Sequence, residues 1–298
     1  MSTGRHSNFS VAVPAFNAEL TISDCVQSAF DSGASSVVVV DDGSKDATAQ
    51  RASSAGARVV RQSNRGASVA RERCIKESTA DYLVLLDADD VLLPAGLRSA
   101  LSDLRGHDEW VGVVGAYLNE SASGSHVVSP WGEGVSFETL LRRGYAPAPP
   151  GAVVWRRAAL AQALTMSPPA LKPRWAEDFE LLVRVTQIGP MGTQEVPVCR
   201  YASVGGKSGG DPSSSIRAAE RIRQYYAAIN DVEIRARSPR DIRALALSRR
   251  AQAVSASRSW ALKGMSYLES PLLYASIARA RLRRRNQTDD QATRRDDD

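Results

Sequence analysis

The segment Asp81-Tyr-Leu-Val-Leu-Leu-Asp-Ala-Asp-Asp-Val91 decides how the rest of this chain is interpreted. Its apolar run has the length and composition of a buried strand, and three carboxylates follow that run directly, at Asp87, Asp89 and Asp90. Ligands of open α/β sheets gather at the carboxyl ends of the strands, where two acids spaced by one residue suit a hard cation. The segment alone also fits an acidic turn in which Asp89 or Asp90 caps the next helix. Residues elsewhere in the chain decide between these interpretations.

Strand and helix patterns alternate before this segment. The strand-like runs are an alternating stretch from Phe9 to Pro14, the valines 37–40 and residues 58–61. A stretch with helical spacing follows each run, and these stretches cover residues 19–32, 46–55 and 66–78. This order predicts a mainly parallel sheet with helices on both faces.

The polar residues that follow these strands would share one edge of the sheet if the crossovers are right-handed. Asp41 and Asp42 would then lie near Asp87 and Asp89, with the arginines of the 64–71 segment facing them. Carboxylates, a cation and guanidinium groups together can bind a diphosphate. The chain lacks the glycine-rich alternatives, because no G-x-G-x-x-G follows the first strand and no complete G-x-x-x-x-G-K-[ST] occurs.

Shorter elements are expected in the second half. The patterns predict strands at 111–117, 152–155 and 192–201, and helices at 94–104, 137–143, 157–164 and 177–188. Two stretches rich in Gly and Ser, 119–134 and 202–215, indicate loops. Three more helices are expected at 216–234, 238–265 and 271–285; the second has Ser238 as N-cap, Pro239 at N1 and Asp241 at N3.

The composition is that of an ordinary globular protein. The chain has 298 residues, of which 43% are hydrophobic, and a net charge of +5. Its three cysteines are too far apart for a zinc site or a disulfide framework, and its three histidines are scattered. No signal peptide and no apolar run of transmembrane length is visible. We therefore expect a cytoplasmic protein.

Five motifs occur in a fixed order: Val13-Pro-Ala-Phe-Asn17, Val40-Asp-Asp-Gly-Ser-Lys-Asp46, Asn64-Arg-Gly-Ala-Ser-Val-Ala-Arg71, Asp87-Ala-Asp89 and Glu177-Asp178. Together they resemble the family 2 glycosyltransferases of the GT-A fold, a Rossmann-like mixed sheet flanked by helices. Each motif alone is a weak signal, and five in register are a strong one. The resemblance does not cover the C-terminal helices.

The resemblance implies a role for each motif. The nucleotide-sugar would be bound by Pro14, Phe16, Asn17, Asp41, Asp42, Arg71, Asp87, Ala88 and Asp89. Within this set, Pro14 and Phe16 would line the base, Asp41 would accept hydrogen bonds from base or ribose, and Arg71 would lie near the diphosphate. Asp89, assisted by Asp87, would bind Mn²⁺ or Mg²⁺. Asp178 would be the catalytic base of an inverting transfer, with Trp155 and Glu177 in the acceptor region.

The same resemblance divides the chain into five parts. We expect a disordered start at 1–8, a nucleotide-sugar-binding half at 9–115 and an acceptor-binding half at 116–215. A C-terminal helical region follows at 216–285, and a disordered tail at 286–298.

Two departures from the family pattern affect the expected chemistry. Many members have a metal-ligating His in a loop after the last strand, and Ser203 stands near that position here. The Q-x-x-R-W signature of processive members is also absent. The sequence therefore indicates transfer of a single sugar, with UDP as the default nucleotide, in polysaccharide, glycolipid or glycoconjugate biosynthesis. A sugar, a lipid-linked molecule or a small molecule would be the acceptor.

Other interpretations remain open at this point. The 83–91 segment also fits the D-x-D-x-[TV] motif of haloacid-dehalogenase-like phosphatases, although three strand-helix units precede it here. A third interpretation is a protein with the GT-A fold that binds ligands without catalysing a reaction. The basic helix 271–285 would contact either an anionic membrane surface, at the inner face of the cell membrane, or the catalytic domain or a second subunit. Nucleic acid is not among the expected partners.

Overall fold

The structure is a computed structural model, and it describes residues 9–121, 124–202, 212–252, 262–263, 265–266 and 268–270. Several expectations lie outside these residues. They are the disordered ends at 1–8 and 286–298, the basic helix 271–285, the Ser203 position, and most of the second half of the helix expected at 238–265.

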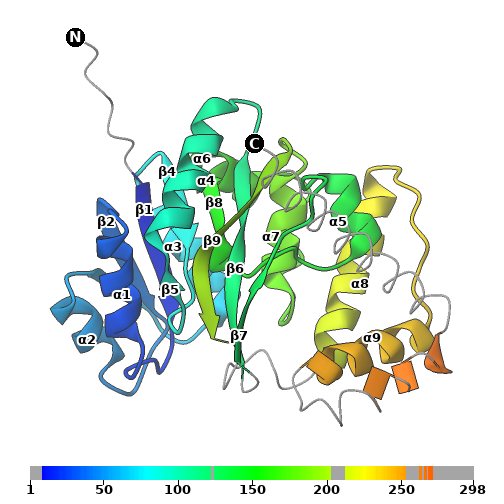
Figure 1. The fold of residues 1–298 in the computed structure, drawn as a ribbon, viewed down its shortest axis with the longest axis horizontal. Helices are drawn as coiled ribbons and strands as arrows, with labels where there is room; N and C mark the ends of the chain where they lie inside the picture. The colour runs from blue at the N-terminus through cyan, green and yellow to red at the C-terminus, as the bar shows by residue number, and fades with distance from the viewer. Residues whose placement is uncertain are drawn as a thin grey trace, which may run out of the picture.

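One mixed sheet forms the centre of the described part of the chain, in the strand order β3-β2-β1-β4-β8-β6-β9-β5 (Figure 1). Its N-terminal side is parallel: β1 (Phe9–Ala15) pairs with β2 (Ser36–Asp41) and β4 (Tyr82–Leu85), and β2 pairs with β3 (Arg58–Arg61). The valine and leucine side chains of β1, β2 and β4 are almost fully buried, because helices cover both faces. The predicted alternation of strands and helices in the first ninety residues is confirmed.

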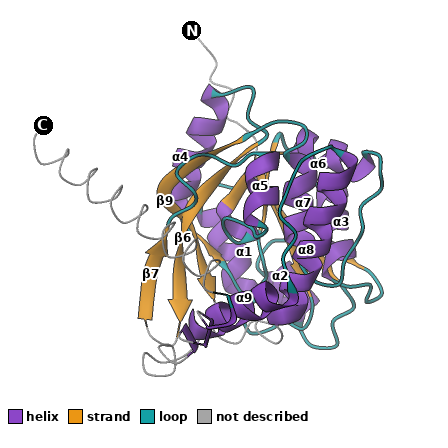
Figure 2. Ribbon diagram, turned by 90° about the vertical axis from the view of Figure 1, so that its right-hand side faces the viewer, coloured by secondary structure: helices purple, strands orange, loops and turns teal. Residues whose placement is uncertain are grey.

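The helices between these strands are α1 (Ile22–Asp31), α2 (Thr48–Ser54) and α3 (Ala67–Glu77). On one face of the sheet α3, α6 (Arg157–Thr165) and α7 (Glu177–Val185) pack side by side, and α4 (Pro94–Gly106) covers the opposite face (Figure 2). The buried acid-bearing strand β4 therefore lies in the middle of the molecule, with α3 and α7 on the same side of it.

The second half of the sheet differs from its predicted outline. The strand expected at 111–117 continues as β6 (Gly112–Ser121), and the expected loop 119–134 contains β7 (Gly124–Val128), which pairs antiparallel with β6. The loop prediction was wrong because backbone pairing, which the Gly- and Ser-rich composition hides, satisfies the hydrogen bonds of this segment. β6 also crosses the expected boundary between the two halves at 115/116.

The remaining strands complete the sheet on that side. β8 (Val153–Arg156) is antiparallel to both β4 and β6, whereas β9 (Met191–Ala202) is parallel to β6. β5 (Val91–Leu92), which the sequence analysis did not predict, pairs antiparallel with β9. Together with the parallel N-terminal strands, these pairs make the mixed sheet that the resemblance implied.

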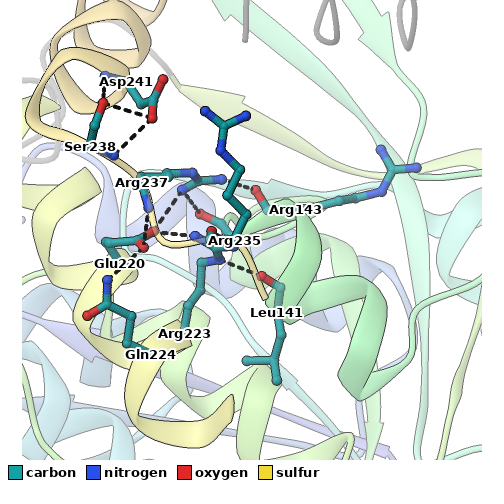
Figure 3. Close-up of polar contacts among 10 residues, drawn as sticks. Leu141, Arg143, Glu220, Arg223, Gln224, Arg235, Arg237, Ser238 and Asp241 are labelled. Carbon is teal, nitrogen blue, oxygen red and sulfur yellow. Dashed lines mark hydrogen bonds and ion pairs between the residues drawn. The ribbon is translucent and has the colours of Figure 1, made fainter. Parts of the chain in front are cut away.

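Three further helices lie together at the end of the molecule opposite β2 and α2 (Figure 1). They are α5 (Phe137–Arg143), α8 (Pro212–Ile229) and α9 (Pro239–Gln252). The predicted cap of α9 is confirmed: Ser238 Oγ accepts from the Asp241 N–H at 3.2 Å, and Asp241 Oδ2 accepts from the Ser238 N–H at 2.9 Å (Figure 3). No helix in the described ranges is both long and apolar enough to span a bilayer.

Candidate active site

The three acids after β4 differ in burial. Asp87 is half-buried, Asp89 is exposed, and Asp90 is buried. The next helix, α4, has Leu93 at its N-cap and no side-chain cap. The alternative in which Asp89 or Asp90 caps that helix is therefore wrong.

Asp90 anchors the end of the last strand. Its Oδ1 accepts from the backbone N–H of Ala202 at 3.1 Å, and its Oδ2 is buried without a partner among the described residues. Burial, and then repulsion from Asp87, raise the pKa of Asp90 to about 8. Asp90 therefore favours its protonated form more than an exposed acid does, which leaves Asp87 and Asp89 as the candidate cation ligands.

Asp87 is held by an arginine. Its Oδ1 accepts from Arg71 Nη2 at 2.9 Å, and Arg71 Nη1 donates to Glu177 Oε1 at 3.1 Å. Arg71 lies on the buried face of α3, with only 7% of its surface exposed. Burial alone would lower the pKa of Arg71, but Asp87 and Glu177 outweigh it and raise this pKa. One charged guanidinium therefore joins the acids after β4 to the first residue of α7.

The beginning of α7 carries the expected catalytic base. Asp178 is half-buried, and its Oδ1 accepts from the N–H of Phe179 at 2.8 Å. A small cavity of about 10 Å³ has Asp178, Arg71 and Trp155 among its lining residues. Burial raises the pKa of Glu177, although Arg71 opposes this effect. The structure thus brings the predicted residues Arg71, Asp87, Trp155, Glu177 and Asp178 together.

A buried hydrogen-bond network attaches α7 to neighbouring parts of the chain. Glu180 Oε1 accepts from Tyr226 Oη at 2.9 Å and from the Leu171 N–H at 2.6 Å, and Arg184 Nη1 donates to the same hydroxyl at 2.9 Å. Arg184 also donates to the carbonyl of Met166 at 2.8 Å. These bonds tie α7 to α8 and to the loop before it, so the first turn of α7 has a rigid base. The sequence analysis did not identify these residues, since only tertiary packing brings them together.

The loops after β1 and β2 are joined to each other. The N–H of Asn17 donates to Ser44 Oγ at 2.9 Å, and Asn17 Oδ1 accepts from the Lys45 N–H at 3.0 Å. Asn17 adopts a left-handed conformation with φ 49°. Pro14 and Phe16 are half-buried beside this junction. The predicted base-lining residues therefore stand on a loop with a fixed shape.

Asp41 and Asp42 are both buried and already hydrogen-bonded. Asp41 accepts from the Ser44 N–H at 2.9 Å and from Arg61 Nε at 3.0 Å. Asp42 accepts from Gln62 Nε2 at 2.8 Å and from the N–H groups of the two residues before α3, at 2.9 and 2.8 Å. Neither hydrogen-bonds to Asp87 in the described residues, so the predicted convergence of the four acids is indirect: α3 starts on Asp42 and reaches Asp87 through Arg71.

A larger cleft lies beside Asp89 and Asp90. It has a volume of about 180 Å³ and is lined by Thr21, Asp24, Asp89, Asp90, Val91, Glu120, Arg200 and Ala202. Arg200 and Glu120 form an ion pair of 3.5 Å across its rim. The sequence analysis missed both residues, because no motif marks the ends of β6 and β9 as neighbours of Asp89.

The two acids suit a divalent cation that keeps other ligands. Oδ2 of Asp87 accepts no hydrogen bond from a described residue, and carboxylate oxygens are hard donors. Within the described ranges, no cluster of three or more His, Cys, Asp or Glu side chains is placed to hold a metal ion. A cation here would therefore take most of its ligands from phosphate oxygens and water, which is how Mg²⁺ is commonly held.

Residues 10–149 match the model of the glycosyl transferase family 2. The matched range contains the Asp41 and Asp87 motifs and ends before Trp155 and Asp178. The chain is 33% identical over 104 residues to the glycosyltransferase AglJ of Haloferax volcanii, which is 34% of either chain. It is 38% identical over 109 residues to the succinoglycan biosynthesis protein ExoU of Rhizobium meliloti, which is 34% of this chain and 32% of the relative. These alignments thus span about a third of the curated relatives.

Solved structures with a similar fold include two bacterial proteins. S. aureus TarS 1–349 in complex with UDP-GlcNAc has a TM-score of 0.60 at 17% identity, covering 91% of this chain and 83% of that one. Glucosyl-3-phosphoglycerate synthase from Mycobacterium tuberculosis, in complex with Mn²⁺, UDP and phosphoglyceric acid, has a TM-score of 0.51 at 20% identity, covering 74% and 78%. At these identities the likeness shows the fold. The fold is therefore the GT-A fold, and the part of the chain that matches the glycosyl transferase family 2 model is its first half, residues 10–149.

Proposed function

We propose that this protein transfers a single sugar from a nucleotide-diphosphate sugar, with UDP as the default, to an acceptor hydroxyl with inversion of configuration. The observation that carries the proposal is the contact of Arg71 with both Asp87 and Glu177. It joins the acids that suit a cation to the helix that carries a candidate base. Donor and acceptor chemistry therefore fit within one site.

Each side of this site has a task in a single displacement. Mn²⁺ or Mg²⁺ held by Asp89 and Asp87 would supply Lewis-acid stabilisation of the departing nucleoside diphosphate. Asp178 accepts the proton of the acceptor hydroxyl as the new bond forms, because a hydroxyl is a poor nucleophile until that proton leaves. Attack from the face opposite the leaving group inverts the anomeric centre.

Some of the residues predicted to bind the donor would act on it indirectly. Pro14, Phe16 and Asn17 line the base from their fixed loop, and the backbone at Ala88 contacts the donor. Asp42 accepts three hydrogen bonds from the 62–66 segment, so we propose that it acts by shaping the start of α3. For Asp41 we keep the contact with base or ribose that the resemblance implies; because its side chain is fully buried, this contact would require the exposed Arg61 side chain to move away.

The comparisons support parts of this proposal. TarS was crystallised with UDP-GlcNAc, and the mycobacterial synthase with UDP and either Mn²⁺ or Mg²⁺. The curated relatives include glycosyltransferases and a succinoglycan biosynthesis protein. We extend to this chain a UDP-sugar donor, a divalent metal and a role in polysaccharide, glycolipid or glycoconjugate synthesis. A cytoplasmic location, contact of the basic helix with a membrane and a second subunit remain predictions.

One experiment tests the transfer and its base. The protein is incubated with Mn²⁺, a panel of nucleotide-sugars and a panel of acceptors, and release of nucleoside diphosphate is measured with and without EDTA. We expect donor-dependent release that EDTA abolishes. Asp178→Asn should lower turnover by about 10²- to 10⁴-fold while UDP affinity stays nearly unchanged. Asp31→Asn, an exposed acid at the end of α1, is the control.

The other outcomes would each contradict a definite part of the proposal. Near-normal turnover by Asp178→Asn, or a product that retains the donor's anomeric configuration, would exclude Asp178 as the inverting base. Full activity in EDTA would exclude the metal. Donor binding without turnover would favour a non-catalytic module, and phosphate release from monoesters would favour the phosphatase that the sequence left open.

A further inference from the structure

We infer that Arg71 is a positioning residue, which fixes the cation-binding acid Asp87 and the first turn of α7 in one geometry, and that it is not a ligand of the donor's diphosphate. This inference rests on the proposed function, because the geometry matters for catalysis only if the protein transfers a sugar. It differs from the role that the family resemblance implies, in which the arginine lies near the diphosphate.

The environment of Arg71 leaves little room for a phosphate. Its side chain is 8% exposed, and its two terminal nitrogens donate to carboxylates at 2.9 and 3.1 Å. Its Nε is buried and has no partner among the described residues. The guanidinium keeps further N–H donors, but because its side chain is only 8% exposed, a diphosphate could reach them only if the packing around Arg71 opened or if Asp87 or Glu177 were displaced. The structure therefore favours the carboxylates as the permanent partners of Arg71.

The two contacts join segments that are distant in the sequence. Asp87 follows β4, Glu177 begins α7, and Arg71 lies in the second turn of α3 between them in space. Among the described residues, no other side chain hydrogen-bonds to both acids. Because Asp178 is the next residue after Glu177, the same contact sets where the base candidate stands relative to Asp87.

The contact also sets the orientation of Asp87. Arg71 binds Oδ1, and Oδ2 accepts no hydrogen bond from the described residues, so Oδ2 is the oxygen left for a cation. A guanidinium can hold two carboxylates in fixed directions because its donors form a rigid planar fork. A lysine at this position would keep the charge and lose that geometry. The charge-conserving change is therefore the informative one.

The test compares Arg71→Lys with Arg73→Lys, an exposed arginine on the same helix that pairs with Glu77 at 3.2 Å. Turnover is measured with the donor that the wild-type protein uses, and binding of UDP and of uridine is measured by calorimetry with Mn²⁺. A displacement of about 1 Å between reacting groups costs about 10²-fold in rate. We expect Arg71→Lys to lower kcat by about 10- to 100-fold with a nearly unchanged Kd for UDP, and Arg73→Lys to change neither.

A second variant and a second readout cover the case in which Arg71→Lys does not fold. Glu177→Gln keeps the shape of the side chain and the Arg71–Asp87 pair, and should lower kcat in the same way. In both variants, amide hydrogen exchange at Phe179 and Glu180, whose N–H groups are hydrogen-bonded, should be faster than in wild type, because the first turn of α7 loses one of its tertiary anchors. Exchange needs no transferase activity, so it tests the inference even if the protein proves not to be a transferase.

Three results would overturn the inference. One is a Kd for UDP raised at least about tenfold in Arg71→Lys with unchanged uridine affinity, which would make Arg71 a diphosphate ligand. Another is wild-type kcat in the folded variants. The third is unchanged exchange at Phe179 and Glu180. Absence of turnover in the wild-type protein would instead contradict the proposed function.

Discussion

Replacing Glu220 by glutamine removes one negative charge from a buried cluster of arginines. Glu220 on α8 is 5% exposed, and its Oε2 pairs with Arg223 Nη1 and lies 3.7 Å from Arg237 Nη1 (Figure 3). Its Oε1 accepts from the Arg237 N–H at 2.9 Å and from Gln224 Nε2 at 3.0 Å. The two arginines in turn donate to carbonyls at the end of α5, at Leu141 and Arg143. Glu220 thus links α8 to the end of α5 and to the start of α9 through its two arginine partners.

The size of the effect follows from the burial of the partners. Arg223 is 3% exposed, so it cannot turn to water when Glu220 loses its charge. Burial, and then repulsion from Arg223, already lower the pKa of Arg237 to about 10, and Glu220 opposes that shift. Breaking a buried ion pair by neutralising one partner costs about 3–5 kcal/mol. For a chain of 298 residues this corresponds to a melting temperature lower by about 5–8 °C.

Urea denaturation and thermal melts at pH 7 measure this loss. Glu233→Gln is the matched control, because Glu233 is exposed between α8 and α9 and the same charge is removed. The control should unfold within about 0.5 kcal/mol of wild type. If Glu220→Gln unfolds as the control does, the cluster does not stabilise the C-terminal helices and the reasoning is refuted.

Two further changes test packing and capping. Gly96→Ala in α4 should destabilise the protein by more than about 2 kcal/mol, because the new Cβ would lie 1.9 Å from the Pro197 carbonyl oxygen. The control is Gly106→Ala on the same helix, whose Cβ would meet nothing within 4 Å and which should be neutral or stabilising by up to about 1 kcal/mol. Equal urea midpoints for the two variants would contradict this prediction. Burial alone would raise the pKa of Asp241, but hydrogen bonds from Ser270 and Ser238 outweigh it and lower this pKa. Asp241→Asn should therefore cost about 1 kcal/mol at pH 7, and the gap from wild type should close as the pH falls from about 4 through the lowered pKa, because the wild-type carboxylate then takes up a proton. A gap that stays constant down to pH 2 would show that the charge of Asp241 is not involved.

Local patterns in the sequence account for much of the fold. The runs of valine and leucine in β2 and β4 and the helical spacing between them predict the parallel half, because each element is specified within its own ten residues. The cap of α9 was predicted for the same reason, since Ser238 and Asp241 are three residues apart. The hairpin of β6 and β7 and the strand β5 were missed. Val91 pairs with Arg200, which is distant in the sequence, so no local sequence pattern indicates this pairing.

The sequence predicted where the site residues lie along the chain, but not which of their side chains contact one another. The sequence placed Asp87 and Asp89 after the central strand and Asp178 at the start of a helix, as the structure does. The sequence analysis also placed Arg71 near a diphosphate, and it predicted no contact between Glu177 and the donor-binding residues. The two residues are 106 positions apart, and their contact depends on how α3 and α7 pack on the same face of the sheet. Charge patterns alone could not distinguish a guanidinium that faces a ligand from one that joins two carboxylates.

The place of β9 in the sheet has a consequence for the order in which the protein is made. β9 ends at Ala202, yet it lies between β6 and β5, whose residues leave the ribosome about a hundred positions earlier. The parallel half can pair as soon as β4 has emerged, whereas β5 and one edge of β6 stay unpaired until translation passes residue 202. During that interval two open strand edges are available to other chains. A pause in synthesis, or a stop codon, before β9 would therefore favour aggregation more than one placed after it.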